Sequence, residues 1–167
     1  MKHSTFMKIA NLIAKESKCV SWQVGAIIVK DDRIISTGYN GTRAGAKNCC
    51  DHAKDQGWLE QRYNPTPPHE NLIVLNQDFR ENHSSWSKKH EIHAELNSIL
   101  YAAKNGFSID GATMYVTLSP CSDCAKAICQ SGLKRIFYSK IYDKNDPDWD
   151  VELIKAGIEL IYLPIGN

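Results

Sequence analysis

The chain has 167 residues and a formal net charge of +1, and 43% of its residues are hydrophobic. This length suffices for one domain with a sizeable core. No apolar run is long enough to span a bilayer and no signal peptide is visible, so we expect no membrane partner. The near-neutral charge, without a basic tail, argues against a nucleic-acid partner and favours a small substrate.

The six cysteines are too sparse for a disulfide scaffold. Without a secretion signal, metal binding is their expected use, and we place the protein in the reducing cytoplasm.

The first part of the chain predicts a helix followed by a β-hairpin. Residues 5–17 carry apolar side chains on one helical face and charges on the other. The continuous apolar run 24–29 is typical of a buried strand, and residues 33–39 predict its antiparallel partner. Residues 38–41 end the hairpin with turn residues that let a ligand approach the backbone closely.

Residues 42–90 show no clear hydrophobic periodicity. They contain two of the six cysteines and four of the six histidines. A short helix is expected over residues 51–59. Because the stretch lacks an apolar core of its own, we interpret it as an irregular insertion within a single domain of residues 1–167.

The second half of the chain alternates helices with strands. The expected elements are a helix over 91–105, a strand over 112–117, a helix over 121–131, a strand over 135–138, a helix over 151–156 and a strand over 158–163. Such alternation favours parallel pairing, with helices on both faces of the sheet. The loops 39–41, 117–120 and 138–144 all follow strands and should meet at one edge, where ligands bind in such folds.

Two short motifs point to a catalytic zinc ion. His93-Ala94-Glu95 and Pro120-Cys121-Ser122-Asp123-Cys124 match, in this order, the zinc-deaminase signature H-x-E…P-C-x-x-C. His93, Cys121 and Cys124 would supply three ligands and leave one tetrahedral position open for water. Zinc lowers the pKa of bound water to about 7, so Glu95, which does not ligate, would take that proton at neutral pH.

Both motifs are expected at the starts of helices. The helix over 91–105 would hold His93 and Glu95 near its beginning, and Pro120 is a favourable first-turn residue for the next helix. The positive dipole ends of two helices would then point at one metal ion and favour thiolate ligands.

Other interpretations of the motifs stay open. A C-x-x-C with a distant histidine also occurs in closed structural zinc sites, as in a non-catalytic scaffold, but such a site has no use for Glu95. The same signature serves enzymes that act on tRNA adenosine or on a free nucleoside. A redox C-x-x-C would not require the neighbouring His-x-Glu.

The chain resembles the deoxycytidylate (dCMP) deaminase family, within the cytidine deaminase-like superfamily, over nearly its whole length. The resemblance rests on segments 24–28, 37–41, 91–97 and 117–124, and Gly38-Tyr39-Asn40-Gly41 narrows it to this family. It implies a three-layer α/β/α fold with a mixed five-stranded sheet. It also implies zinc-dependent hydrolysis of dCMP to dUMP and ammonia, which supplies dUMP for dTTP synthesis, in a homohexamer.

The resemblance also implies which residues contact the substrate. Those assigned to the sugar and base are Val24, Asn40, Ala94, Thr117 and Ser119. Asn40 would contact the sugar, the Ala94 backbone the base, and carbonyls near Thr117 and Ser119 the 4-amino group. Many cellular members have an arginine near residues 22–23 that suits the phosphate, and this chain has none. Tyr142 and Lys144 follow a strand end and are the phosphate candidates, with a plain surface role as the alternative.

The chain is most similar to the bacteriophage members of the family, which implies the host cytoplasm as its compartment. The same similarity implies a second, structural zinc ion. Its ligands would be Cys19, Cys49, His83 and Glu91, and the alternative ligands are Cys50, His52, His69 and His90. The ion would hold the insertion against the first helix and the start of the catalytic helix. Structural zinc stabilises small peptides by roughly 10–16 kcal/mol, enough to order a loop without a core.

Relatives of this kind are activated by dCTP and inhibited by dTTP at a site distinct from the zinc. The glycine-flanked loop Asn40-Gly41-Thr42-Arg43 suits a triphosphate, through backbone N–H groups and one arginine. Asp51 would assist through Mg²⁺ or a nucleotide hydroxyl, and Tyr101 and Lys104 would face a neighbouring subunit. The alternative is a tight turn and a solvated lysine.

Overall fold

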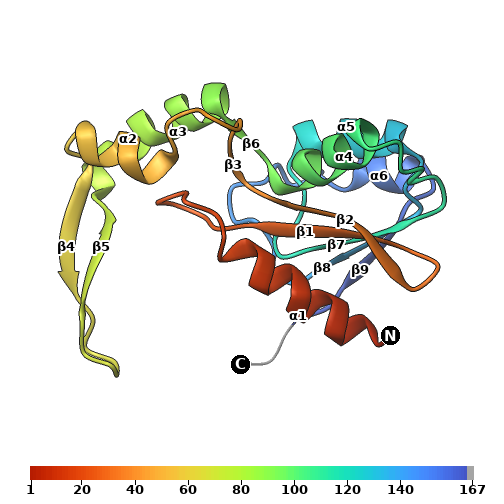
Figure 1. Cartoon of the computed structure of the whole chain (residues 1–167), viewed down its shortest axis with the longest axis horizontal. Helices are drawn as coiled ribbons and strands as arrows, with labels where there is room; N and C mark the ends of the chain where they lie inside the picture. Colours follow the sequence, from red (N-terminus) through yellow and green to blue (C-terminus); the bar gives the residue numbers. More distant parts are fainter. Residues whose placement is uncertain (165–167) are drawn as a thin grey trace.

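A sheet of five strands forms the centre of the computed structural model, which describes residues 1–164 (Figure 1). The strand order is β2-β1-β7-β8-β9. The strands are β1 (Gly25–Lys30), β2 (Arg33–Tyr39), β7 (Thr113–Val116), β8 (Arg135–Tyr138) and β9 (Glu159–Tyr162). β1 pairs antiparallel with both neighbours, whereas β7, β8 and β9 are parallel. The predicted mixed five-stranded sheet is confirmed, and its antiparallel half comes from the hairpin.

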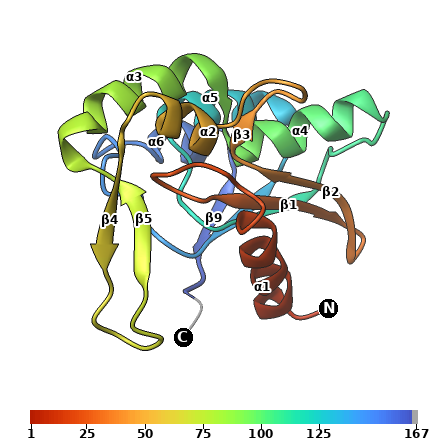
Figure 2. The ribbon, with the colours of Figure 1, turned by 60° about the vertical axis from the view of Figure 1, so that its left-hand side comes forward.

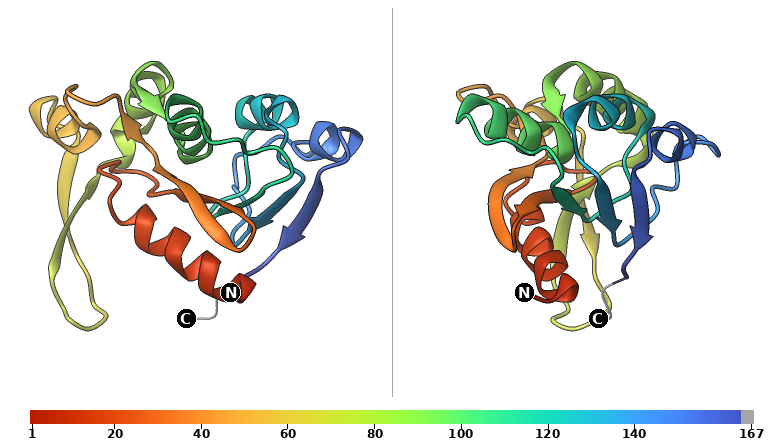
Figure 3. Two further views of the ribbon diagram at one scale, coloured as in Figure 1. Left: turned by 45° about the vertical axis from the view of Figure 1, so that its right-hand side comes forward. Right: turned by 90° about the vertical axis from the view of Figure 1, so that its right-hand side faces the viewer.

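Helices cover both faces of this sheet. α1 (His3–Ala14) packs on one face, and α4 (Ala94–Lys104), α5 (Ser122–Ser131) and α6 (Val151–Lys155) pack on the other (Figure 3). The predicted three-layer arrangement is therefore confirmed. None of the helices in residues 1–164 is long and apolar enough to cross a membrane.

β1 shows why its sequence is a continuous apolar run. Ala26 and Ile28 pack in the cluster beneath α4 and α5, whereas Ile27 and Val29 pack against α1. Because successive side chains of a strand point to opposite faces, burial on both sides requires apolar residues at every position.

Gly25 marks the closest approach of α1 to the sheet. A Cβ atom at this position would lie 2.5 Å from the backbone nitrogen of Ala14 and closer still to the carbonyl oxygen of Ala10. The helix backbone occupies the space that any larger residue would need, so the glycine fixes how α1 seats on β1.

Residues 42–90 contain regular structure, which corrects the prediction that this insertion is irregular. The segment contains β3 (Gly41–Thr42), α2 (Cys49–Asp55), β4 (Leu59–Tyr63), β5 (Asn71–Leu75), the 3₁₀ turn η1 (Gln77–Phe79) and α3 (Arg80–His90). β4 and β5 form a hairpin that projects beside the sheet (Figure 2). The segment also has a small buried cluster of its own, formed by Ala53, Trp58 and Leu75.

The two helices that carry the zinc motifs begin later than predicted. Glu91 and Ile92 form a short strand, β6, paired antiparallel with β3. His93 is consequently the N-cap of α4 rather than a helical residue, and Cys121 is the N-cap of α5. Pro120 therefore precedes the helix instead of occupying its first turn. The pairing of β6 with β3 is tertiary, so helical periodicity alone could not reveal it.

Candidate active site

The three predicted zinc ligands meet where α4 and α5 begin. The Sγ atoms of Cys121 and Cys124 each lie 3.4 Å from His93 Nδ1, and all three ligand atoms lie within 4.8 Å of one another. Neither N-cap side chain bonds to its own helix, so both are free to point at a common centre. One imidazole nitrogen and two sulfurs form a donor set that fits zinc and leaves a fourth position open.

Electrostatics at this centre favour a cation. A hydrogen bond with Cys124, assisted by one with His93, outweighs burial and lowers the pKa of Cys121 to about 4. The hydrogen bond with Cys121 raises the pKa of His93 to about 9. The hydrogen bond between the two cysteines raises the pKa of Cys124, so without a metal ion one thiolate faces a protonated imidazole, a positive charge whose place a bound metal ion would take.

Glu95 lies in the first turn of α4, beside these ligands, and only 4% of its surface is exposed. Burial raises the pKa of its carboxyl group to about 7. A carboxyl group with that pKa can accept and release protons near neutral pH, as a general acid–base group must. The arrangement can therefore support metal-assisted hydrolysis.

One cavity joins this centre to the loops that follow the strands. Its wall includes His93, Ala94, Glu95 and Cys121. It also includes residues from the predicted strand 24–29 and from the loops 39–41, 117–120 and 138–144: Val24, Asn40, Leu118, Ser119, Tyr142 and Lys144. Of the predicted substrate contacts, only Thr117 is missing from the described wall. The loops after β2, β7 and β8 thus converge as predicted.

Residues 1–140 match the family described as "Cytidine and deoxycytidylate deaminase zinc-binding region". The chain is 54% identical to deoxycytidylate deaminase of Enterobacteria phage T4, over 100% of this chain and 92% of the phage protein. It is also 54% identical to the enzyme of phage T2, over 100% and 95% of the two chains. The crystal structure of dCMP deaminase from cyanophage S-TIM5 in complex with dCMP and dUMP superposes with a TM-score of 0.70 at 30% identity, covering 98% of this chain and 99% of that one.

The chain belongs to the cytidine and deoxycytidylate deaminase family. The family's zinc chemistry accounts for the donor set at His93, Cys121 and Cys124, and the chain is a zinc-dependent hydrolase.

Asn40 is held firmly within the cavity wall of this deaminase. Its Oδ1 accepts a hydrogen bond from the Val24 backbone at 2.8 Å, and its Nδ2 donates to the Trp22 carbonyl at 2.8 Å. Ser17 Oγ donates to the Asn40 carbonyl. An amide side chain has further capacity, one lone pair on Oδ1 and one N–H, so Asn40 can still bind a ligand.

Thr117 supports the sheet edge and is not part of the described cavity wall, so its contact with the substrate stays a prediction. Its hydroxyl oxygen accepts a hydrogen bond from the Gly25 backbone at 3.1 Å, and its carbonyl accepts one from Ser139 Oγ at 2.9 Å. Ser119 does reach the cavity. Its hydroxyl oxygen accepts bonds from the Tyr142 backbone and from Asn145, which fixes the loop that carries Tyr142.

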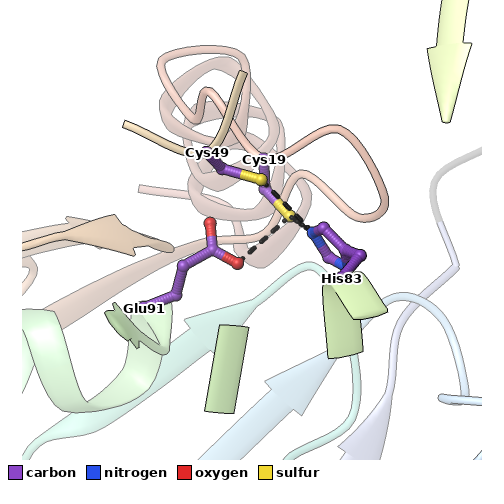
Figure 4. Close-up of side chains that lie close together, drawn as sticks. All are labelled: Cys19, Cys49, His83 and Glu91. Carbon is purple, nitrogen blue, oxygen red and sulfur yellow. Dashed lines mark hydrogen bonds between the residues drawn. The ribbon is translucent and has the colours of Figure 1, made fainter. Parts of the chain in front are cut away.

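Four further side chains form a second cluster (Figure 4), and they come from the loop after α1, from α2, from α3 and from β6. Their ligand atoms lie within 4.8 Å of one another, in Cys19, Cys49, His83 and Glu91. His83 Nε2 lies 3.2 Å from Cys49 Sγ and 3.6 Å from Cys19 Sγ. The predicted ligands of a second metal ion are thus brought together.

Glu91 has a buried oxygen that a cation could use. Its Oε2 accepts hydrogen bonds from Ser87 and Cys19, whereas its Oε1 is the one buried side-chain oxygen or nitrogen without a partner among residues 1–164. Burial, and then the charge of Cys19, raise the pKa of Glu91 to about 7. A metal ion would satisfy the unpaired oxygen and neutralise the buried charge.

The alternative ligands lie outside this cluster. His52 stacks on Trp86 with ring centroids 4.4 Å apart, and His90 stacks on the same indole at 5.0 Å. Cys50 and His69 are likewise not among the described cluster members.

Of the residues predicted to bind the regulatory nucleotide, only Asn40 lines the described cavity. Gly41 and Thr42 form β3, and Arg43 donates to the carbonyl of its neighbour Ala44. Asp51 accepts a hydrogen bond from Asn48, the N-cap of α2. Tyr101 and Lys104 lie exposed on α4.

Several cavity residues escaped sequence reasoning. They are Ser21, Trp22, Arg80, Ser84, Ser87 and Leu118. Arg80, Ser84, Ser87 and the cluster residues His83 and Glu91 recur at three- and four-residue steps. This spacing is the signal of a helix face, but α3 is so polar elsewhere that its periodicity was hidden.

Proposed function

We propose that the chain catalyses hydrolysis of dCMP to dUMP and ammonia. The observation that carries this proposal is the buried Glu95 beside the His93, Cys121 and Cys124 donor set, at the bottom of an open cavity. The T4 and T2 relatives carry the name of this activity, and the S-TIM5 enzyme was crystallised with both the substrate and the product of the reaction.

His93, Cys121 and Cys124 would hold a zinc ion, which would supply Lewis acidity and lower the pKa of a coordinated water. Glu95 accepts a proton from the attacking water and delivers it to N3 of the pyrimidine. It then moves the proton of the new 4-hydroxyl to the 4-amino group, which leaves as ammonia as the C4–N bond breaks and the C4 carbonyl forms. A pKa of about 7 allows the Glu95 carboxyl group both to accept and to release a proton near neutral pH. Asn40 binds the deoxyribose with its remaining hydrogen-bonding capacity, and the Ala94 backbone contacts the base.

The second cluster is proposed to bind a structural zinc ion. Two sulfurs, one imidazole and one carboxylate match a closed tetrahedral set. The unpaired Oε1 of Glu91 supports this assignment. The ion would link α2 and α3 to the loop after α1 and to β6, and so fix the inserted segment against the catalytic helix.

Regulation and assembly complete the proposal. dCTP would activate and dTTP would inhibit a homohexamer, at a site formed by Gly41, Thr42 and Arg43 with Mg²⁺ and Asp51. Tyr101 and Lys104 are exposed on the catalytic helix, which supports a subunit contact there. The free thiols of the described residues suit the reducing cytoplasm.

A substrate comparison tests the proposed reaction. Ammonia release is measured from dCMP, CMP, dCTP, deoxycytidine and a tRNA at equal enzyme concentration. We expect kcat/KM to be highest for dCMP. Equal values for dCMP and deoxycytidine would contradict the assignment, and inosine formation in the tRNA would replace it with the competing adenosine deaminase.

A further inference from the structure

We propose that Arg80 binds the 5′-phosphate of the substrate and thereby determines the preference for a nucleotide over a nucleoside. This inference rests on the proposed deamination of dCMP and identifies the residue that recognises the phosphate.

The inserted segment brings Arg80 to the cavity. Arg80 is the first residue of α3, and the face of α3 that lines the cavity continues through His83, Ser84 and Ser87. His83 is buried and contacts Cys49, so the first turn of α3 is fixed by the second cluster. Arg80 is therefore positioned by a rigid helix rather than by a free loop.

The guanidinium of Arg80 is not held by an ion pair. It donates a hydrogen bond to the neutral Oε1 of Gln77 at 3.4 Å, and no ion pair within residues 1–164 includes it. The carboxylates in the cavity wall are Glu91 and Glu95, which are buried and belong to the two metal-binding centres. A half-buried arginine without a carboxylate partner is available for an anionic ligand.

Arg80 also lies near the loop that carries the phosphate candidates predicted from the sequence. Arg80 and Tyr142 line the same cavity. Burial, then the charges of Asp143 and Cys121, raise the pKa of Tyr142, and the positive charge of Arg80 opposes this effect. Tyr142 packs edge-to-face against Trp22 with ring centroids 6.4 Å apart, and Lys144 lines the same cavity. Two cations and a phenol thus belong to the wall of one cavity.

The phosphate lies far from the reacting atom within the substrate itself. The reacting C4 atom must approach buried Glu95, whereas the 5′-phosphate is at the opposite end of the nucleotide. A planar guanidinium can donate two parallel hydrogen bonds to phosphate oxygens, and Lys144 can add a point charge. The chain thus has a phosphate-binding cation although residues 22–23 contain none.

The test compares wild-type protein with Arg80→Gln and Arg80→Lys. We measure kcat/KM for dCMP and for deoxycytidine, and we measure binding of dUMP and of deoxyuridine by calorimetry at fixed ionic strength. Arg62→Gln is the matched control, because Arg62 lies on the β4–β5 hairpin and pairs with Glu60.

For Arg80→Gln we expect the dCMP-to-deoxycytidine ratio of kcat/KM to fall by about 10- to 100-fold, since a charge-assisted hydrogen bond is lost. The affinity for dUMP should fall by a similar factor relative to deoxyuridine. Arg80→Lys should retain part of the kcat/KM preference for dCMP and part of the dUMP affinity. Arg62→Gln should keep the wild-type values of both quantities.

An unchanged ratio, or an equal loss for nucleotide and nucleoside, would overturn the assignment of Arg80 while leaving dCMP deamination in place. A wild-type protein that does not deaminate dCMP would reject the proposed reaction, and the dUMP-binding measurement would still decide the role of Arg80.

Discussion

Glu95 is the residue on which the chemistry depends most directly. Glu95→Gln preserves shape but removes the group that carries protons, and it leaves His93, Cys121 and Cys124 unchanged. We expect an unchanged zinc content and a kcat reduced by at least ~10²–10⁴-fold, the usual contribution of a general acid–base group. Steady-state rates and metal analysis of the same preparation measure both quantities.

The exposed Glu16 provides the control for this substitution, since Glu16→Gln makes the same chemical change away from the cavity. Retention of more than about a tenth of the wild-type rate by Glu95→Gln would show that another group transfers the protons.

At the scale of single residues, the sequence predicts the metal ligands better than it predicts the cavity wall. His93, Cys121 and Cys124 occur in a pattern set by the coordination geometry of zinc, and they do converge. Thr117 and Arg80 show the limit. Thr117 hydrogen-bonds to the sheet edge, and Arg80 reaches the cavity through an element whose position depends on tertiary contacts.

At the scale of elements, the contact between α1 and β1 is tightest at Gly25. Gly25→Ala would place a Cβ against the helix backbone at Ala10 and Ala14, and neither backbone atom can move without displacing the helix. Overpacking of this kind typically costs about 1–3 kcal/mol of unfolding free energy. Chemical denaturation measures the loss.

Gly41→Ala is the matched control for this overpacking. Its Cβ would meet no atom closer than Tyr39 Cε2 at 3.9 Å. Equal stability of the Gly25→Ala and wild-type proteins would mean that α1 is not seated as described.

The second cluster joins four elements, and its metal content can be counted. We expect about two zinc ions per wild-type chain and about one in Cys49→Ser, because structural sites need all four ligands. Cys49→Ser should also unfold at a lower temperature, since metal binding contributes folding free energy. Elemental analysis and thermal unfolding provide the measurements.

The neighbouring Cys50 gives a control one residue away, because it lies outside the described cluster. Cys50→Ser should keep both zinc ions. A wild-type protein with a single zinc ion per chain would contradict the second site.

The inserted segment shows why some elements could not be predicted. β5 exposes Leu72 and Ile73 at adjacent positions, so the hairpin lacks the alternation expected of a half-buried strand. α3 has one buried residue, His83, whose burial reflects the cluster rather than an apolar face. The main sheet was predictable because its strands are apolar on both faces or alternate regularly.

At the scale of the whole molecule, the proposed regulation predicts a change in the shape of the rate curve. Rate against dCMP should be sigmoidal without effector, hyperbolic with Mg²⁺–dCTP and depressed by dTTP. Coupling of about 1–3 kcal/mol corresponds to roughly 5–150-fold in affinity. Arg43→Ala should weaken both responses, because Arg43 is the charged donor of the proposed site.

Sedimentation of the same samples should show a hexamer. Hyperbolic kinetics that neither triphosphate alters would remove the regulatory proposal without affecting the catalytic one.

The central claim is that water replaces the 4-amino group of dCMP. The most direct measurement is the reaction of zinc-loaded wild-type protein with dCMP in ¹⁸O-labelled water, followed by mass spectrometry of the nucleotide and assay of ammonium. Hydrolytic deamination should give dUMP that carries the label at C4, with about one ammonium formed per dUMP. Unchanged dCMP, or ammonium without labelled dUMP, would contradict it.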